Sequence, residues 1–309
     1  MDTPGETSMD IDYQTALSRG LLPIREVARQ TGVIPVTLRA WERRYGLVAP
    51  LRTSKGHRLY TEDDVVRIRL ILTWLDRGVA VGQVKGLLKE QQPPAAPEPT
   101  SASPWEEQRQ HLLEAIGSLN ERQLDERFNA SMALYPPQTL YRQLLQPVLE
   151  ELEQRWRGQF GRQAERVFLH SWLRTKLGAR LYHNNRQFSG APILMMNVSD
   201  LPMEPGLWLA AWLTSSADCA VEVFDWPVPA TELPLVVARI QPRALMLYSS
   251  QPISPGQLPR LLNGHRCPCL LGGPAAAIHQ ADSVPGVILA ESPLDAFQAL
   301  SDLGLLHNR

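Results

Sequence analysis

Ten side chains between residues 37 and 60 are of the types that bind nucleic acid. Arginine can meet a phosphate or a guanine edge with two parallel N–H bonds, whereas the other side chains make single contacts, mostly to backbone oxygens. They form two clusters: Thr37, Arg39, Arg43, Arg44 and Tyr45, and then Arg52, Lys55, His57, Arg58 and Tyr60. The pattern predicts that the first cluster reads bases and phosphates of double-stranded DNA and that the second holds the duplex backbone.

Two short helices are predicted to position the first cluster. Residues 24–31 carry apolar side chains at helical spacing, and Gly32 can take the left-handed backbone angle that ends a helix. Pro35 is tolerated at the start of a second helix over residues 36–45, because its missing N–H would have no partner there. In this second helix Trp41 points inward and the arginines point outward, which indicates a helix-turn-helix.

A second set of elements is predicted to follow directly. Residues 52–60 are polar and basic, which is typical of a wing, a small β-turn laid beside the duplex backbone. Thr61 then caps a third helix whose first turn is acidic, as the helix dipole favours. After Gly78 a fourth helix is expected from Val81.

The order of these residues resembles a known family. The run VTLRAWERRYGL, followed by the spaced residues P.RT..GHRLYTEDDV..I, is similar to the DNA-binding domain of MerR-family transcriptional regulators. The match covers a dozen or more residues at fixed spacing and is therefore specific. It implies a winged helix-turn-helix dimer that binds a pseudo-palindromic promoter, works there with RNA polymerase, and answers a signal received by its C-terminal part.

Charge and proline content divide the chain. Residues 21–92 hold thirteen Lys and Arg against seven Asp and Glu, whereas residues 190–309 hold five against ten, which favours DNA binding at one end only. The run QPPAAPEPTSASP disfavours helix and sheet and predicts a semi-rigid tether. We therefore expect a flexible acidic tail over 1–20, the DNA-binding domain over 21–91 and the linker over 92–104.

The remainder is predicted to form two sensor modules. Residues 105–189 favour a four-helix bundle, with helices expected at 105–118, 121–135, 138–158 and 162–184. Residues 190–309 alternate buried strands with helices, which predicts a Rossmann-like or flavodoxin-like parallel sheet. The strands are expected at 192–198, 220–224, 244–248, 269–271 and 287–289. Ligands of such sheets bind at the carboxyl ends of the strands.

Bundle and sheet behind such a DNA reader resemble the light-responsive LitR/CarH regulators, in which the two modules together hold a cobalamin. That family carries Asp-x-His-x-x-Gly after the first strand, with the His on cobalt. Here Met203 stands at the His position and Leu201 at the Asp position, and a thioether is a poor substitute for imidazole on Co(III). Val167 and Phe168 stand where the family's bundle carries a Glu-His pair.

The candidate ligand pocket is therefore a reduced one. Its residues are Met203, Ser249, Ser250, Gly272, Gly273 and Phe168. The two glycines either admit the nucleotide tail of a ligand or serve a tight strand-to-helix turn. We predict that no cofactor is bound, and that the pocket holds a different molecule or no small ligand. A partner protein, such as a light sensor, would then supply the signal. The alternative is a cobalamin-dependent photoreceptor repressor with non-standard ligands.

Other chemistry finds no support in the residue pattern. There is no catalytic triad context or phosphate loop, and the three cysteines lack the spacing of a zinc site. No signal peptide is recognisable, and no apolar run approaches the ~18 residues of a membrane span, so we expect a cytoplasmic protein. The prediction is a homo-oligomeric, sequence-specific transcriptional regulator without enzymatic activity. A protein-interaction scaffold that has lost DNA binding is the alternative from another class.

Overall fold

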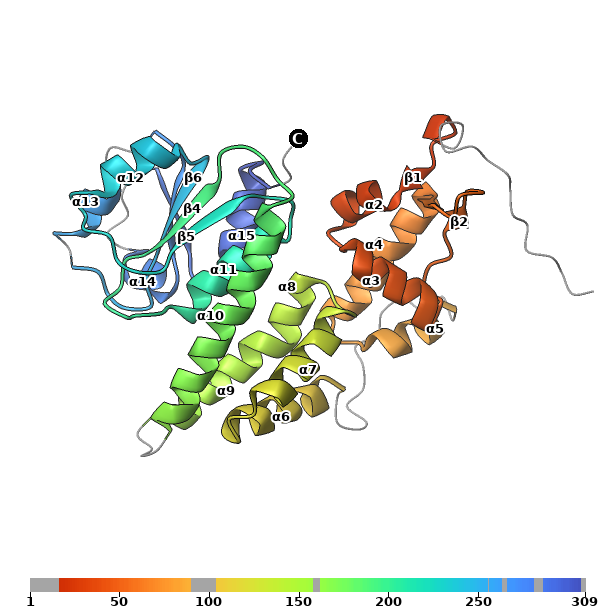
Figure 1. Cartoon of the computed structure of the whole chain (residues 1–309), viewed down its shortest axis with the longest axis horizontal. Helices are drawn as coiled ribbons and strands as arrows, with labels where there is room; N and C mark the ends of the chain where they lie inside the picture. Colours follow the sequence, from red (N-terminus) through yellow and green to blue (C-terminus); the bar gives the residue numbers. More distant parts are fainter. Residues whose placement is uncertain are drawn as a thin grey trace, which may run out of the picture. The chain divides into compact units, whose positions relative to one another are not determined.

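The chain forms two compact units, Met1–Arg162 and Gln163–Arg309. The computed structural model describes residues 17–89, 104–157, 162–254, 256–262, 266–280 and 286–306 (Figure 1). Most of the expected acidic tail and of the expected linker therefore lies outside the described residues, although Pro104 already begins a helix.

The first unit begins with the predicted helix-turn-helix and wing. Its elements are β1 (Leu22–Pro23), α2 (Ile24–Thr31), α3 (Pro35–Ala40), the π-helical turn η1 (Trp41–Tyr45), β2 (Leu51–Arg52), β3 (Arg58–Tyr60), α4 (Glu62–Asp76) and α5 (Val81–Lys89). The three strands pair antiparallel in the order β1-β3-β2. The predicted second helix is thus present, but its last five residues wind as a π-helix.

Local signals explain where these elements begin and end. Gly32 has φ 71° and donates its N–H to the Ala28 carbonyl, which ends α2 as expected. Thr61 and Asp64 form a reciprocal capping box at the start of α4, which stabilises this helix by about 1 kcal/mol. The core beneath them contains the fully buried side chains of Leu38 and Trp41.

The same unit continues into a helical module. Its elements are α6 (Pro104–Gly117), α7 (Glu121–Met132), α8 (Pro137–Leu140), the π-helical turn η2 (Tyr141–Leu145) and α9 (Gln146–Trp156). The third expected helix is therefore three joined segments. The Trp105 and Tyr135 rings lie 4.3 Å apart between centroids in its core. The fourth expected bundle helix, α10 (Gln163–Asn185), falls in the second unit instead.

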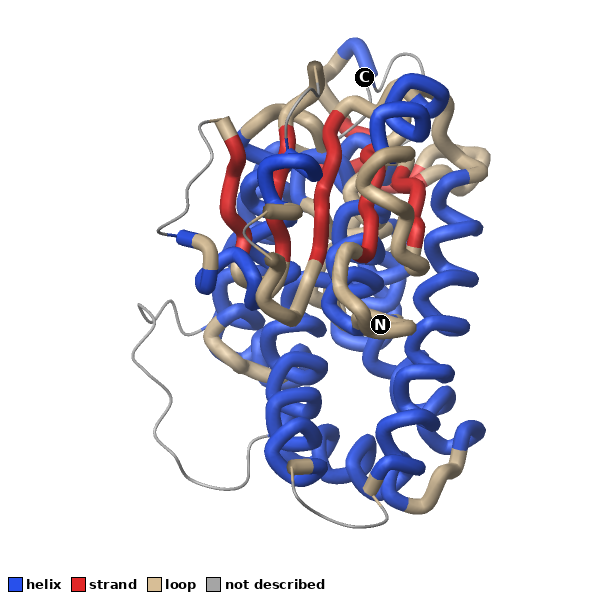
Figure 2. Tube along the Cα trace, turned by 90° about the vertical axis from the view of Figure 1, so that its left-hand side faces the viewer, coloured by secondary structure: helices blue, strands red, loops and turns tan. Residues whose placement is uncertain are grey.

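The second unit is built on the predicted parallel sheet. Its strands are β4 (Ile193–Asn197), β5 (Val221–Phe224), β6 (Ala244–Tyr248), β7 (Cys269–Gly272) and β8 (Val287–Ala290), in the order β5-β4-β6-β7-β8. Figure 2 shows these strands side by side with helices on both faces. This order is that of a flavodoxin-like sheet.

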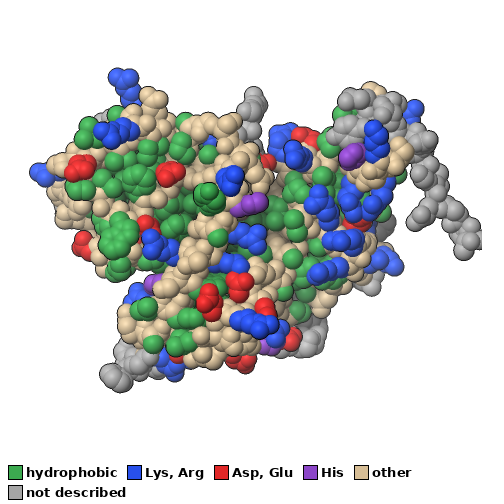
Figure 3. Space-filling model, in the orientation of Figure 1, with side chains coloured by type: hydrophobic (Ala, Val, Ile, Leu, Met, Phe, Trp, Pro, Cys, Tyr) green, Lys and Arg blue, Asp and Glu red, His purple; other side chains and the backbone are tan. Residues whose placement is uncertain are grey.

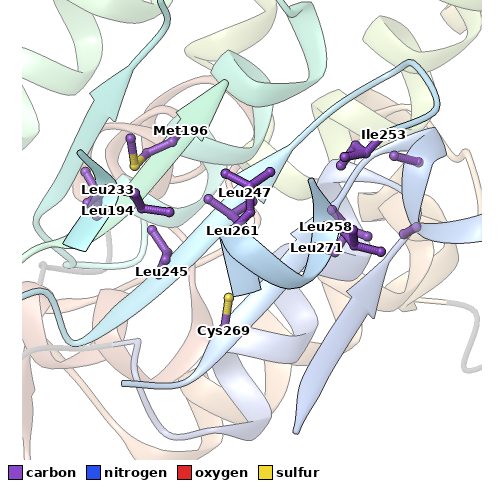
Figure 4. Close-up of a cluster of buried hydrophobic side chains, with 12 residues drawn as sticks. Leu194, Met196, Leu233, Leu245, Leu247, Ile253, Leu258, Leu261, Cys269 and Leu271 are labelled. Atoms are coloured by element: carbon purple, nitrogen blue, oxygen red, sulfur yellow. The ribbon is translucent and has the colours of Figure 1, made fainter. Parts of the chain in front are cut away.

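Helices cover both faces of this sheet. They are α11 (Pro205–Ser215), α12 (Leu233–Ile240), α13 (Leu258–Leu262), α14 (Pro274–Ile278) and α15 (Pro293–Asp302). On one face α11 packs against α15, and α10 packs against α11. On the other face Leu233 and Leu258 lie against alternate residues of β4, β6 and β7, as Figure 4 shows. The short helix α14 was not expected from the sequence.

Candidate DNA-binding surface and sensor pocket

Three predicted base-reading side chains lie on the surface of α3 and η1. Arg39, Arg43 and Arg44 are all exposed, whereas Leu38 and Trp41 of the same segment are fully buried. The Arg43 Nε donates to the Arg39 carbonyl at 3.4 Å, so this guanidinium lies along the helix. Figure 3 shows Lys and Arg side chains gathered over this part of the first unit. One helix face therefore presents three guanidinium groups to solvent.

The wing is a tight turn organised by Thr53. The Thr53 N–H donates to the His57 carbonyl at 3.0 Å, and the Gly56 N–H donates to the Thr53 carbonyl at 2.8 Å. The Thr53 hydroxyl accepts the His57 N–H at 3.1 Å, and Gly56 has φ 80°, a backbone angle that favours glycine. Lys55 and His57, both predicted to contact the duplex backbone, are exposed at this turn.

Two predicted contacts are corrected by the structure. Thr37 and Tyr60 have no exposed surface and belong to the core, so they cannot touch a duplex in this conformation. Burial, more than the neighbouring Glu42 charge, raises the pKa of Tyr60 to about 12. Tyr45 is half-buried, with its ring 3.7 Å from the position of a Cβ at Gly82 of α5. Residue type alone did not reveal which hydroxyls point inward.

Two wing arginines are bound by an acid that the sequence analysis did not single out. Arg52 Nη2 donates to Glu42 Oε1 at 2.6 Å, and Arg58 Nε donates to Glu42 Oε2 at 2.5 Å. Burial raises the pKa of the Glu42 carboxyl, but the hydrogen bonds from Arg58 and Arg52 together outweigh it and leave the pKa below its ordinary value. The only available signal was one acid inside the basic run RAWERRYG.

Within the first unit, hydrogen bonds join the winged helix-turn-helix of residues 22–89, which we call the DNA reader, to the helical module of α6 to α9. The Trp41 indole Nε1 donates to the Leu134 carbonyl at 2.8 Å, although 93 residues separate the two. The Thr139 hydroxyl donates to Asp76 Oδ1 at 2.9 Å, and Gln143 Nε2 donates to the Asp76 carbonyl at 2.9 Å. We call residues 133–139, which are the connection after α7 and the first three residues of α8, the α7–α8 corner. This corner contacts the buried side of α3 and η1, which together we call the recognition helix.

A hollow of about 440 Å³ lies in the second unit between α10 and the loop after β4. Val167, His170 and Arg174 line one wall, and Met203 and Trp226 line others. Burial and the nearby Arg166 guanidinium lower the pKa of His170 to about 4, so its imidazole is neutral near pH 7. Arg174 Nε lies 2.6 Å from Asp225 Oδ2. Of the predicted pocket residues, Met203 lines this hollow and Phe168 does not.

The space beside the predicted pocket glycines is filled by another side chain of the protein. A Cβ at Gly206 would lie 1.8 Å from the Tyr248 Oη, and one at Gly273 would lie 2.8 Å from the Tyr248 Cζ. The Tyr248 ring therefore fills the space between these glycines at the carboxyl edge of the sheet, and Gly272 is in close contact with it as well. Of the two roles that the sequence left open for Gly272 and Gly273, these contacts favour the tight strand-to-helix turn, because both glycines lie against the tyrosine ring and Gly273 caps α14.

The two serines after β6 also have internal partners. Ser249 is fully buried, and its hydroxyl donates to the Gln251 carbonyl at 2.7 Å. Ser250 donates both its N–H and its hydroxyl to Glu204 Oε1, at 2.9 and 2.8 Å. Among the described residues, no group of three or more His, Cys, Asp or Glu side chains is placed to hold a metal ion. No described helix has the length and apolarity to span a membrane.

Comparison with known proteins gives this arrangement a family. The family described as "MerR HTH family regulatory protein" matches residues 22–91, and the "B12 binding domain" family matches residues 108–181. The HTH-type transcriptional regulator MlrA of Salmonella typhimurium is 35% identical over 204 residues, covering 66% of this chain and 79% of MlrA. The chain belongs to the MerR family of HTH-type transcriptional regulators.

A second HTH-type regulator is similar over a larger share of the chain. The HTH-type transcriptional repressor CarH of Myxococcus xanthus is 25% identical over 277 residues, covering 84% of this chain and 90% of CarH. Among solved structures, the methanol:cobalamin methyltransferase complex MtaBC of Methanosarcina barkeri aligns with a TM-score of 0.32 and 16% identity, covering 71% of this chain and 92% of that one.

Proposed function

We propose that this MerR-family regulator binds promoter DNA as a homodimer, with α3 and η1 of each copy in successive major grooves. The exposed guanidinium groups of Arg39, Arg43 and Arg44 on one helix face carry the proposal. In this arrangement they read base edges and phosphates, and Lys55 and His57 at the wing turn hold the duplex backbone. The regulator then acts in the cytoplasm, on transcription by RNA polymerase, and performs no catalysis.

Selection of genomic fragments by the purified full-length protein, followed by footprinting of the enriched sites, tests this function. We expect two protected half-sites whose centres are one helical turn of DNA, or a multiple of it, apart. The triple variant Arg39→Ala, Arg43→Ala, Arg44→Ala should enrich nothing, although its circular dichroism is unchanged. Equal enrichment by the triple variant, or protection without half-sites, would contradict the proposal.

The signal is proposed to reach the sensor through a partner protein rather than through cobalamin. A B12 binding domain implies that cofactor, but the residues present do not fit it. Met203 takes the position where the LitR/CarH pattern has the cobalt-binding His, and the Tyr248 ring fills the space between Gly206 and Gly273 that a nucleotide tail would need. A light-sensing protein is one partner compatible with the likeness to LitR/CarH regulators.

One observation favours the alternative, a cobalamin-dependent regulator with non-standard ligands. The neutral imidazole of His170 lines the same hollow as Met203, and neutral imidazole is a metal ligand. The absorption spectrum of the dialysed protein after incubation with adenosylcobalamin, in the dark and after illumination, separates the two. We expect no retained corrin band. A retained band that His170→Gln abolishes would replace our proposal with the alternative.

The α7–α8 corner is proposed to carry the signal to the DNA reader. Its Thr139 hydroxyl donates a hydrogen bond to Asp76 of the reader. Its Leu134 carbonyl accepts one from Trp41, which lies in the recognition helix itself. A displacement of the corner therefore changes the support of the recognition helix without touching DNA. This route needs no contact between the partner protein and the promoter.

A further inference from the structure

We infer that Glu42 determines the DNA specificity of this regulator by withholding two wing arginines from non-specific phosphate contacts. This inference rests on the proposed DNA binding and adds to it a residue that carries the opposite charge to DNA-binding groups. Glu42 belongs to η1 of the recognition helix, whereas Arg52 and Arg58 belong to β2 and β3 of the wing. Three elements of the interface thus meet at one carboxylate.

The geometry uses the whole carboxylate. Oε1 takes the Arg52 guanidinium at 2.6 Å and Oε2 takes the Arg58 guanidinium at 2.5 Å, so each oxygen holds one cation. The Glu42 side chain is 15% exposed and the Arg58 side chain 18%, while Arg52 is 50% exposed. Charge-assisted hydrogen bonds of this kind are about twice as strong as neutral ones, and partial burial weakens screening by salt.

The wing strands explain why a carboxylate is needed at this place. Arg52 and Arg58 are directly opposite each other in the β2–β3 ladder. Like charges directly opposite in an antiparallel pair destabilise it. Glu42 lies between the two guanidiniums and offsets one of their two positive charges, and it also ties both wing strands to the recognition helix.

The pairing divides the cations of the interface into two groups. Arg39, Arg43 and Arg44 are exposed on the recognition helix. Within the described residues, the carboxylate of Glu42 binds only the two wing-strand arginines. Binding that depends only on phosphate charge grows with every available guanidinium, whatever the base sequence. Holding two of them on Glu42 lowers this non-specific binding and leaves the helix arginines to read bases.

Glu42→Gln tests the inference in the full-length protein. Anisotropy titrations would compare a duplex carrying the footprinted half-sites with a scrambled duplex of equal length and composition, from 50 to 200 mM KCl. Releasing two guanidiniums should steepen the log–log salt dependence on the scrambled duplex by up to about 1.8. Across this salt range, the affinity of Glu42→Gln for the scrambled duplex should therefore fall by about tenfold more than the affinity of wild type does. Affinity for the half-sites should gain less, because base contacts fix the register there and leave the released guanidiniums fewer phosphates to choose from, so that the specific-to-non-specific ratio drops.

Glu26→Gln is the matched control. It removes one negative charge from the same domain and frees one guanidinium, that of Arg29, but on helix α2, which belongs to neither the wing nor the recognition helix. Among the bonds within the described residues, Glu26 accepts only from Arg29 and Gln30 of this helix. We expect its specificity ratio to stay near that of wild type. A second variant, Glu42→Gln with Arg52→Gln, should recover part of the lost ratio because one released guanidinium is gone.

Three outcomes would overturn the inference. The first is an equal ratio in Glu42→Gln and Glu26→Gln. The second is a uniform loss on both duplexes with an unchanged salt slope, which assigns Glu42 a purely supporting role. In both cases wild type still prefers the half-sites, so the proposed function stands while the inference fails. The third is a wild-type protein that does not distinguish the duplexes, in which case both fall together.

Discussion

The residues that the sequence suggests for ligand binding are exposed in the DNA reader but packed against a buried side chain at the carboxyl edge of the sheet. In the reader, Arg39, Arg43 and Arg44 remain on the surface, while Leu38 and Trp41 of the same segment are buried. At the sheet edge, the glycines that could admit a ligand surround the buried ring of Tyr248. Residues of a family pattern can therefore stay exposed in one domain and pack against a buried ring in another, and only contacts between distant residues distinguish the two.

Tyr248→Ala gives the largest expected effect and tests the packing side of this comparison. Removing a ring that is buried among Gly206 and Gly273 should cost about 3–5 kcal/mol of the free energy of unfolding of the second unit. Chemical denaturation followed by tryptophan fluorescence measures it. Tyr182→Ala, at an exposed tyrosine of α10, is the control and should change stability by less than about 0.5 kcal/mol. Equal losses would show that the ring is not structural packing.

Two glycines with nearly the same backbone angle sharpen the comparison. Gly273 has φ 87° and an added Cβ would lie 2.7 Å from the Ser249 carbonyl, whereas Gly56 of the wing has φ 80° and, within the described part of the chain, open space around it. Gly273→Ala should therefore cost about 2–4 kcal/mol of stability, and Gly56→Ala only the left-handed strain of about 1–2 kcal/mol. Thermal unfolding of both variants decides. A larger loss for Gly56→Ala would contradict the assignment of the crowded site.

Arg43→Ala tests the exposed arginines of the DNA reader. We expect a loss of about 1–3 kcal/mol in affinity for the footprinted half-sites with no change in unfolding midpoint, because the side chain is exposed and donates a hydrogen bond to the Arg39 carbonyl of its own helix. Anisotropy titration measures the affinity. Arg122→Ala on α7 removes an equally charged, exposed side chain outside the reader and should leave affinity unchanged. An unaltered binding curve for Arg43→Ala would remove this residue from the interface.

Thr139→Ala has the smallest expected effect and addresses the contact between reader and helical module. It removes the hydrogen bond to Asp76 and should cost about 1 kcal/mol of stability in the first unit. Hydrogen exchange at α4 and α8 would show whether the loss spreads into the reader. Ser118→Ala, just after α6, serves as the control, because within the described residues its hydroxyl bonds only to carbonyls of α6. If both variants behave alike, the corner does not couple to the reader.

The sequence predicted much of the local structure because its signals come from near neighbours. The capping box at Thr61, the helix end at Gly32 and the five apolar strands all depend on residues within a few positions of one another. The strand order follows less directly, but alternation of strands and helices already indicated a parallel sheet. In contrast, Thr37 and Tyr60 were assigned by residue type, and type does not say which face of an element is buried.

By itself the sequence determined the winged reader, its exposed arginines and the α/β class of the second unit, since periodicity, capping and motif spacing are written along the chain. Tertiary structure alone decided three other features. Glu42 binds arginines ten and sixteen residues away, Trp41 bonds a carbonyl 93 residues away, and Tyr248 fills the space beside Gly206 and Gly273. Each is a contact between segments that meet only after folding, and no local pattern specifies which side chain a folded core will place beside another.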